Sequence, residues 1–200
     1  MNPEIIQPKI QYFSEGQLSA LRGLDPSDAT NKYLGWLHNP DVADLTYASQ
    51  FPPTISGLRT WIEQFKHSDS SLAFAVLSKE SGKHVGNATI NRINWSTGTA
   101  DLGLMIGEKG FANSKFISDV WTSVINYAFG KLRLRRLYTG IMEPATEYIK
   151  AAESLNFVQE GSGGSIQSLV GNSKTSCFSD YSSRSGHLNI GKDQSAVDPC

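Results

Sequence analysis

The sequence has little that would indicate an extracellular, membrane-spanning or metal-binding protein. Only two of its 200 residues are cysteine, Cys177 and Cys200, and their separation matches no metal or redox motif. No apolar run approaches the roughly 18 residues that a membrane span requires. Residues 1–8 lack the basic and then apolar pattern of a signal peptide. We therefore expect a cytoplasmic protein with no structural disulfide, no bound metal and no contact with a membrane.

An excess of one charge is also missing. The 18 Lys and Arg residues nearly balance the 19 Asp and Glu residues, so the chain offers no strongly basic face to nucleic acid or to an anionic membrane. A hydrophobic fraction of 39% over this length is enough for one domain with a full core. We predict a single domain over residues 1–184, with an N-terminal arm at 1–17, and a flexible tail at 185–200.

The clearest pattern lies in residues 99–142. A strand-like run, Ala100–Ile106, is followed by a polar loop over residues 107–115, and a second strand-like run, Arg136–Met142, ends the stretch. Between the loop and the second strand, apolar residues recur at helical spacing, at Phe116, Ile117, Val120, Trp121, Val124, Ile125 and Ala128. This order predicts a βαβ unit, whose loop directs backbone N–H groups to whatever lies at the helix N-terminus.

Antiparallel strands are predicted on either side of this unit. Leu72–Ser78 and Val85–Ile93 flank a turn signal and form a hairpin, with Gly86 at a bulge or a close approach. Leu18–Leu24 is predicted to be an edge strand. After the unit, strands are predicted at 157–160, 166–170 and 176–181, with a flexible tract at 161–164 and a turn at 171–172.

Helices are predicted before and after the strands. One begins at Asp25-Pro26 and ends before Asn39-Pro40, because aspartate caps a helix and proline suits its first turn. A second follows Thr54 and runs through Phe65, and a third covers Thr146–Leu155. The fold class is therefore mixed α/β.

Several segments, taken in order, resemble one family. Ala100–Gly107 resembles a strand written A-E-(I/L)-G-x-x-I, and Ile125–Phe129 resembles a helix end written (L/I)-x-Y-A-F. Leu134–Leu137 resembles L-x-R-(I/V/L), and Glu153–Gly161 resembles E-K-L-G-F-x-x-E-G. Tyr33–Val42 resembles Y-L-x-W-L-N-D-P-E-V. Together they resemble the GNAT acyltransferases, closest to the branch that includes the ribosomal-protein N-terminal acetyltransferases, over residues 18–183.

This resemblance implies a central mixed, largely antiparallel sheet flanked by helices, and acetyl-CoA as the acyl donor. A helix N-terminus would hold the pyrophosphate, a splayed strand edge would pair with the pantetheine amides, and a backbone N–H near Met105 or Ile106 would meet the thioester carbonyl. The residues expected to bind the coenzyme are Leu104, Met105 and Ile106 in the strand and Ala112, Asn113, Ser114, Lys115, Phe116 and Ile117 in the loop and helix start.

The chain departs from the family in this loop. The family pattern (R/Q)-x-x-G-x-(G/A) falls on residues 112–117, and neither glycine is present. Lys115 and Ile117 bring bulk where glycine allows close approach to a phosphate. Lys115 could instead supply a positive charge, and Asn113 and Ser114 could cap the helix or donate hydrogen bonds.

Two further positions differ from the family. Ala145 stands where the family often has an Asn that contacts pantetheine, and Ala152 stands where many relatives have a Tyr that protonates the leaving thiolate. Tyr148, one helical turn earlier, either takes over the role of the acid or packs in the core.

The resemblance implies that a primary amine attacks the thioester directly. Asp101 occupies the position of a strand Glu in the family and is the first candidate for the base, although it could be an ordinary surface carboxylate. His84, His38 and Glu143 are the other candidates. The acceptor is an amino sugar, a protein N-terminus or a small amine, and the segment at 33–42 favours an amino sugar. Two aromatic residues, Tyr47 and Phe51, either line its pocket or pack between helices.

Two alternatives remain at this stage. The missing glycines and the alanines at 145 and 152 also suit a non-catalytic binding module that has kept the fold. Separately, the glycine-rich tract at 161–164 and an unpaired strand edge after Phe157 could support a homodimer.

Overall fold

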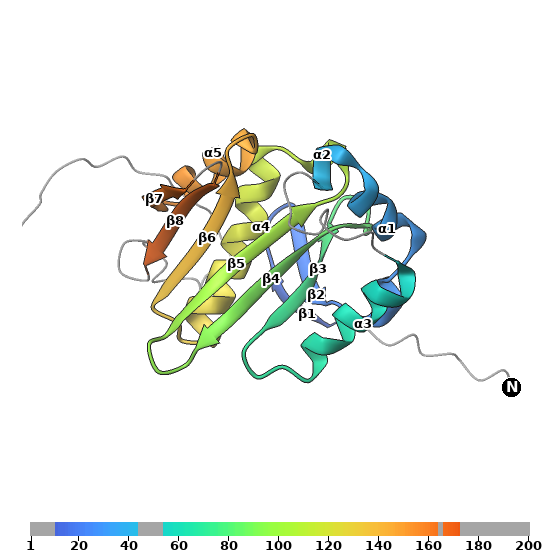
Figure 1. Cartoon of the computed structure of the whole chain (residues 1–200), viewed down its shortest axis with the longest axis horizontal. Helices are drawn as coiled ribbons and strands as arrows, with labels where there is room; N and C mark the ends of the chain where they lie inside the picture. The colour runs from blue at the N-terminus through green and yellow to red at the C-terminus, as the bar shows by residue number, and fades with distance from the viewer. Residues whose placement is uncertain (1–10, 44–53, 164–165, 173–200) are drawn as a thin grey trace, which may run out of the picture.

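The structure of the protein is a computed structural model, and it describes residues 11–43, 54–163 and 166–172. Eight strands form one sheet in the order β1-β2-β3-β4-β5-β6-β8-β7 (Figure 1). Among the described strands, only the β5–β6 pair is parallel, and the other pairs are antiparallel. The strands are β1 (Tyr12–Glu15), β2 (Ser19–Gly23), β3 (Leu72–Ser78), β4 (His84–Asn94), β5 (Thr99–Ile106), β6 (Arg136–Met142), β7 (Val158–Gly163) and β8 (Ile166–Asn172).

Helices cover both faces of the sheet. In Figure 1, α4 and α5 lie behind the sheet, and α1, α2 and α3 lie at the opposite face toward one side. The helices are α1 (Asn31–His38), α2 (Pro40–Ala43), α3 (Ile55–Lys66), α4 (Ser114–Asn126) and α5 (Thr146–Ser154), and a π-helical turn (Tyr127–Lys131) follows α4. The predicted fold, a mixed and largely antiparallel sheet flanked by helices with a βαβ unit at its centre, is confirmed.

The larger apolar core lies under α4. All seven positions predicted from helical spacing are buried, and Ile117, Val120 and Ala128 have no exposed surface. They pack against sheet residues that include Phe74, Val76 and Ala88, together with Ala151 and Ala152 of α5. The apolar face of α4 therefore fixes where its N-terminus lies relative to the sheet.

A smaller core lies on the opposite face. Tyr33 and Trp36 of α1 and Leu58 and Ile62 of α3 pack over Ala73, Ala75 and Met105. Met105 belongs to β5, so its side chain anchors the strand to the helices at its C-terminal end. The same end of β5 leads into the loop before α4.

The predicted helix after Asp25 is wrong as a single element. Asp25 and Asp28 form a capping box that closes a short 3-10 helix, Pro26–Asp28, and Thr30 then caps α1 by accepting a hydrogen bond from the Tyr33 N–H at 3.3 Å. Two cap residues in succession thus divide the segment. The predicted end before Asn39-Pro40 is confirmed, but α2 begins directly at Pro40.

The edges of the sheet also differ from the prediction. Residues 12–15, expected in an arm, form edge strand β1, so β2 lies inside the sheet rather than at its edge. Gly171 and Asn172, predicted as a turn, pair with β6 within β8, and Gly161 lies within β7. The predicted strand at 176–181 and the tail at 185–200 lie outside the described residues.

The prediction for Gly86 is confirmed. The β3–β4 register shifts beside it, and a Cβ at this position would lie 2.3 Å from the Met105 carbonyl oxygen. The missing side chain lets β4 approach β5 closely where β5 ends.

One carboxylate fastens the β1–β2 turn to α4. Asp119 accepts hydrogen bonds from the backbone N–H groups of Gln17, Leu18 and Ser19 at 2.7, 3.1 and 2.9 Å, and from the Ser19 hydroxyl at 2.7 Å. Ser19 is fully buried, so water could not accept its hydrogen bonds if the Asp119 carboxylate were removed.

We expect Asp119→Ala to lower the free energy of unfolding by about 2 to 3 kcal/mol, because it leaves buried donors without an acceptor. Urea denaturation followed by circular dichroism measures the change. Ser118→Ala, one position away on α4, should cost less than about 0.5 kcal/mol. Equal losses for the two variants would contradict this role of Asp119.

Candidate active site

The β5–β6 pair opens into a gap. Its parallel ladder contains three pairs, Thr99 with Arg136, Ala100 with Leu137 and Asp101 with Tyr138. Beyond them β5 continues beside β4, whereas β6 continues beside β8 along its whole length. Figure 1 shows the two strands diverging toward α5. The facing edge of β5 over residues 102–106 therefore lacks a strand partner in β6.

The amide of Ile106 points into this gap. Gly107 donates its N–H to the Val85 carbonyl of β4 at 2.9 Å, and N–H directions alternate along a strand, so the Ile106 N–H points away from β4. It donates to the Tyr148 hydroxyl of α5 at 2.9 Å, in a buried position. Of the two amides proposed from the sequence, Ile106 is therefore the one directed at the gap, and the Met105 amide faces β4.

A second pair of contacts lies at the N-terminus of α4. Asn113 caps the helix, and its Oδ1 accepts from the Phe116 N–H at 3.0 Å. The Ser114 N–H donates to Glu147 Oε2 of α5 at 2.8 Å. The hydrogen bonds from the Lys150 side chain and from Ser114 lower the pKa of Glu147 to about 2. A carboxylate thus occupies the end of α4 that favours anions.

Phe116 and Ile117, two bulky residues of the loop pattern, do not obstruct the surface of the loop. Phe116 and Ile117 are buried in the core under α4, and the Phe116 ring lies 5.0 Å from that of Phe111. Ala112, Asn113 and Lys115 are exposed. The obstruction expected from Ile117 is therefore absent, because helical geometry directs its side chain to the sheet.

The start of the loop rests on α1. A Cβ at Gly107 would lie 2.0 Å from Trp36 Cδ2, so only glycine fits between the strand end and the indole. Trp36 Nε1 donates to Glu108 at 3.2 Å, and Lys32 pairs with Glu108 at 3.0 Å. The hydrogen bond from Lys32 is the main cause that lowers the pKa of Glu108. Trp36, which is buried in the smaller core, thus also supports the loop.

A buried polar cluster lies beside this support. Arg22 donates to both carboxylate oxygens of Asp28, at 2.7 and 2.6 Å. His84 Nε2 lies 2.9 Å from Asn87 Oδ1, and its Nδ1 lies 3.9 Å from Asp28. Burial lowers the pKa of His84, which keeps the imidazole neutral at pH 7. Asn87 and Asp28 hold the imidazole in place. These contacts suit a structural role as well as that of a base, so His84 stays a candidate for the base.

Asp101 lies at the opposite end of β5. It pairs with Tyr138 at the last ladder position and forms an ion pair with Arg92, whose φ is 51°. Asp101 and Ile106 are five positions apart in β5, or about 16 Å at the usual rise of a strand. One bridging water cannot span this distance, so Asp101 could act on an amine near Ile106 only through a chain of several waters.

The remaining predicted site residues lie apart from one another. His38 is exposed on α1, and Glu143 is exposed directly after β6. Ala145 and Ala152 are buried in the core under α4. Tyr47 and Phe51 lie outside the described residues.

Sequence reasoning missed Glu147. No local motif marks it, because its partner Ser114 lies 33 residues earlier in the chain. Tyr148 was noted only as a substitute acid or a core residue, and its contact with Ile106 joins residues 42 positions apart. The only feature of the sequence that could have indicated Glu147 is its place, because it is a charged residue at the start of the helix predicted after the βαβ unit.

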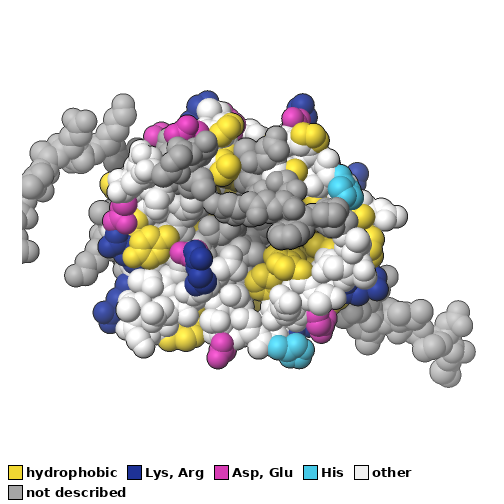
Figure 2. All heavy atoms as spheres, in the orientation of Figure 1, with side chains coloured by type: hydrophobic (Ala, Val, Ile, Leu, Met, Phe, Trp, Pro, Cys, Tyr) yellow, Lys and Arg dark blue, Asp and Glu magenta, His cyan; other side chains and the backbone are white. Residues whose placement is uncertain are grey.

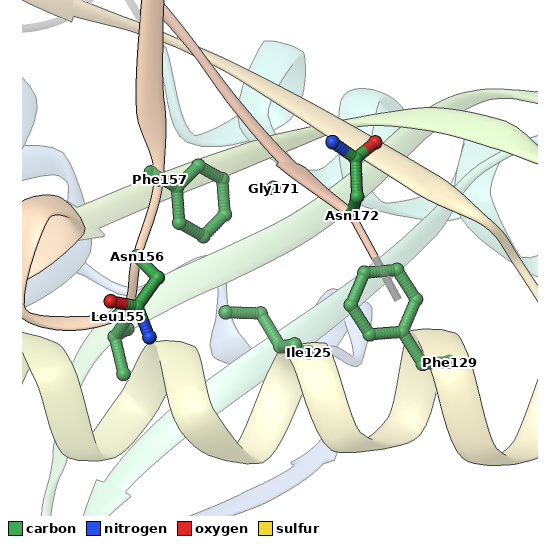
Figure 3. Close-up of a pocket in the computed structure, with 7 residues that line it drawn as sticks. All are labelled: Ile125, Phe129, Leu155, Asn156, Phe157, Gly171 and Asn172. Carbon is green, nitrogen blue, oxygen red and sulfur yellow. The ribbon is translucent and has the colours of Figure 1, made fainter. Parts of the chain in front are cut away.

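A hollow at the other end of α4 does not contribute to this site. Figure 3 shows the rings of Phe129 and Phe157 beside Gly171 and Asn172. A Cβ at Gly171 would lie 3.0 Å from the Phe157 ring, so the hollow is closely filled by side chains.

Within residues 11–43, 54–163 and 166–172, no group of three His, Cys, Asp or Glu side chains could hold a metal ion. In the same part of the chain, no helix combines the length and the apolar character needed to cross a membrane.

The sequence and the fold match those of a known family. The family model described as "Acetyltransferase (GNAT) domain" matches residues 20–158, which is most of the chain, so this protein belongs to the GNAT acetyltransferases. A curated relative, the uncharacterized N-acetyltransferase p20 of Bacillus licheniformis, is 30% identical over 88 residues, or 44% of this chain and 49% of that protein. The match thus spans about half the length of that relative.

Solved structures show the same fold. The spermidine N-acetyltransferase of Vibrio cholerae in complex with CoA and spermine aligns with a TM-score of 0.64 at 18% identity, over 78% of this chain and 96% of that one. A probable acetyltransferase aligns with a TM-score of 0.67 at 18% identity, over 83% and 96%. A domain from Methanocaldococcus jannaschii aligns with a TM-score of 0.64 at 17% identity, over 77% and 97%. These matches do not single out the ribosomal-protein branch, which stays a prediction.

We expect Gly107→Ala to destabilise the protein by about 1 to 3 kcal/mol, as overpacking commonly does, because the new methyl group would overlap the Trp36 ring. Thermal unfolding measures the effect. Gly110→Ala is the matched control in the same loop, because a Cβ there meets nothing within 4 Å. Equal unfolding temperatures for the two variants would show that Trp36 does not support the loop as described.

Proposed function

We propose that this protein transfers an acetyl group from acetyl-CoA to a primary amine, by direct attack while both substrates are bound. The observation that carries the proposal is the gap between β5 and β6, into which the Ile106 amide points. The loop that begins beside this amide ends at the N-terminus of α4. A strand edge and a helix N-terminus joined by one loop suit a ligand with amide groups and phosphates.

The described residues lie where the amide groups and the phosphates of such a ligand would need partners. The free edge of β5 at Leu104–Ile106 would hold the pantetheine amides, and the amides of Ser114 and Lys115 with the Lys115 ammonium would hold the pyrophosphate. Acetyl-CoA supplies an acetyl thioester, which an amine can attack at the carbonyl carbon. The Ile106 N–H would donate to the carbonyl oxygen as negative charge develops there.

The transfer also requires movement of a proton. The amine nitrogen forms a bond to the carbonyl carbon, the C–S bond breaks, and the amine gives up one proton as the sulfur leaves. We propose Asp101 as the group that takes this proton, through a chain of several waters because of its distance from Ile106, and His84 as the alternative.

The charges near the site favour an acceptor with a single amine. Glu108 is paired with Lys32, Asp28 with Arg22 and Asp101 with Arg92. Figure 2 shows acidic and basic side chains scattered over the face that carries α1 to α3, without a cluster of one sign among the coloured residues. The Vibrio cholerae neighbour acts on spermidine, a polyamine. For this chain we propose instead an amino sugar or a protein N-terminus, because a polycation needs several unpaired carboxylates.

Self-association through the β7 edge remains a prediction. Val158 on this edge is 60% exposed, and β7 pairs only with β8 in the described sheet. A dodecameric structure of the Vibrio cholerae enzyme shows that proteins of this fold can assemble.

A non-catalytic binding module is the second candidate. It is favoured by the two hydrogen bonds that already engage the Ser114 and Ile106 amides. Ala145 and Ala152 also favour this candidate, because neither has a polar side chain with which to contact a ligand.

The two candidates are separated by binding and turnover together. We expect acetyl-CoA at 100 times its Kd to add about 2.7 kcal/mol to the stability, measured by thermal unfolding. We also expect acetylated products when a panel of amino sugars, N-terminal peptides and small amines is examined by mass spectrometry. Binding without any product would support the binding module, and neither binding nor product would contradict both.

If Asp101 accepts the proton, Asp101→Asn should lower kcat about 100-fold with little change in KM, within the usual range for a general base. Steady-state kinetics on the best amine measures this change. Arg92→Gln is the matched control, because it breaks the same ion pair but leaves the carboxylate in place, and it should retain most of the activity. Similar losses in both variants would show that the ion pair is structural and that Asp101 is not the base.

A further inference from the structure

Two consecutive residues of α5 bind two of the backbone amides that the proposed function assigns to acyl-CoA. Glu147 Oε2 accepts from the Ser114 N–H at 2.8 Å, and the Tyr148 hydroxyl accepts from the Ile106 N–H at 2.9 Å. Ile106 ends β5 and Ser114 begins α4. The two contacts therefore lie at the two ends of one loop, residues 107–113.

We propose that Glu147 and Tyr148 are internal competitors of acyl-CoA and set the affinity of this site for it. In this view the coenzyme binds by exchanging both hydrogen bonds for its own. The proposal rests on the function proposed above, because it requires that acyl-CoA binds at this loop.

Glu147 has the chemistry of a phosphate substitute. Its ionised carboxylate lies at the positive end of α4, the position that phosphate groups take at helix N-termini. The side chain is 36% exposed, so solvent and ligand can reach it. Lys150 also donates to Glu147, at 2.8 Å, and would remain as its partner after Ser114 is released. The pKa of about 2 keeps Glu147 ionised throughout the neutral range.

Tyr148 has the chemistry of a carbonyl substitute. Its hydroxyl oxygen is a neutral acceptor, as the amide and acyl carbonyl oxygens of the coenzyme are. Burial raises the pKa of Tyr148 to about 12, so the hydroxyl stays neutral. The ring packs edge-on against Trp121, with centroids 6.1 Å apart, and Trp121 Nε1 is buried without a hydrogen-bond partner among the described residues.

The two contacts are not what holds α5 to the sheet. Ala151 and Ala152 of α5 are fully buried in the core under α4, and Phe157 stacks on Trp121 directly after the helix. This apolar contact would persist while the two hydrogen bonds are exchanged, so α5 can stay docked when a ligand takes the amides.

The proposal is tested by measuring the Kd of CoA by titration calorimetry for the full chain and three variants. We expect Glu147→Ala to bind CoA about tenfold more tightly than wild type, because one charge-assisted hydrogen bond no longer competes. Glu153→Ala is the matched control. It removes one exposed carboxylate from the same helix, so it corrects for the change in net charge, and its Kd should change less than twofold.

Tyr148→Phe tests the second contact while keeping the ring. We expect tighter binding of CoA, by at least threefold, because the Ile106 amide loses its internal acceptor. A drop in kcat with unchanged CoA affinity would instead identify Tyr148 as the proton donor to the leaving thiolate, and would overturn its role as a competitor.

A readout without any coenzyme is amide hydrogen exchange. The Ser114 amide should exchange faster in Glu147→Ala, and the Ile106 amide faster in Tyr148→Phe, each relative to wild type and to Glu153→Ala. Unchanged exchange at both amides would overturn the proposal, because the contacts would then not protect these groups in solution.

The titration also separates the two proposals. If neither Glu147→Ala nor Tyr148→Phe binds CoA more tightly than Glu153→Ala does, competition is excluded and acyl-CoA binding stands. If the wild type and all variants are folded but none binds CoA, the acyl-CoA function itself fails, and the competition proposed on it fails with it.

Discussion

The structure depends on one constraint of backbone pairing at β5. This strand pairs with β4 along all of its length except a register shift near Ala100, and β6 pairs with β8 along its whole length, whereas β5 and β6 share only three pairs. The remaining edge of β5 carries N–H and C=O groups inside the protein, where unpaired groups are costly. A ligand or another part of the chain must supply the partners, and at Ile106 a hydroxyl from α5 does so.

The loop after β5 is held from both faces of the sheet. On one face, Trp36 of α1 fills the space that a side chain at Gly107 would need and binds Glu108. On the other face, α4 and α5 are fixed by the core, and Glu147 binds the first amide of α4. The position of the helix N-terminus therefore follows from two separate apolar clusters, and the missing loop glycines do not alter it.

The sequence predicted what depends on local order. Apolar runs and a turn signal located β3, β4 and β5, helical spacing located α4, and the burial of Ile117 follows from the same helical period that identified the helix. The division after Asp25 was missed because Thr30 supplies a second cap that the first cap signal obscured. The contacts of Glu147 and Tyr148 were missed because they join distant parts of the chain, and no local pattern encodes them. Edge strand β1 pairs with the next strand in the chain, β2, and was missed because its short sequence, Tyr-Phe-Ser-Glu, does not alternate apolar and polar side chains.

The placement of two indoles gives the protein its own optical reporters. Trp36 lies directly beneath the first residue of the loop, and Trp121 lies edge-on to Tyr148. Tryptophan emission depends on the polarity and the hydrogen bonds around the ring, so a rearrangement of the loop or of Tyr148 changes the surroundings of a different indole in each case. The chain has four tryptophans, so the change in emission that is lost when Trp36 or Trp121 alone is replaced with phenylalanine reports motion on its own side of the sheet, without an attached dye.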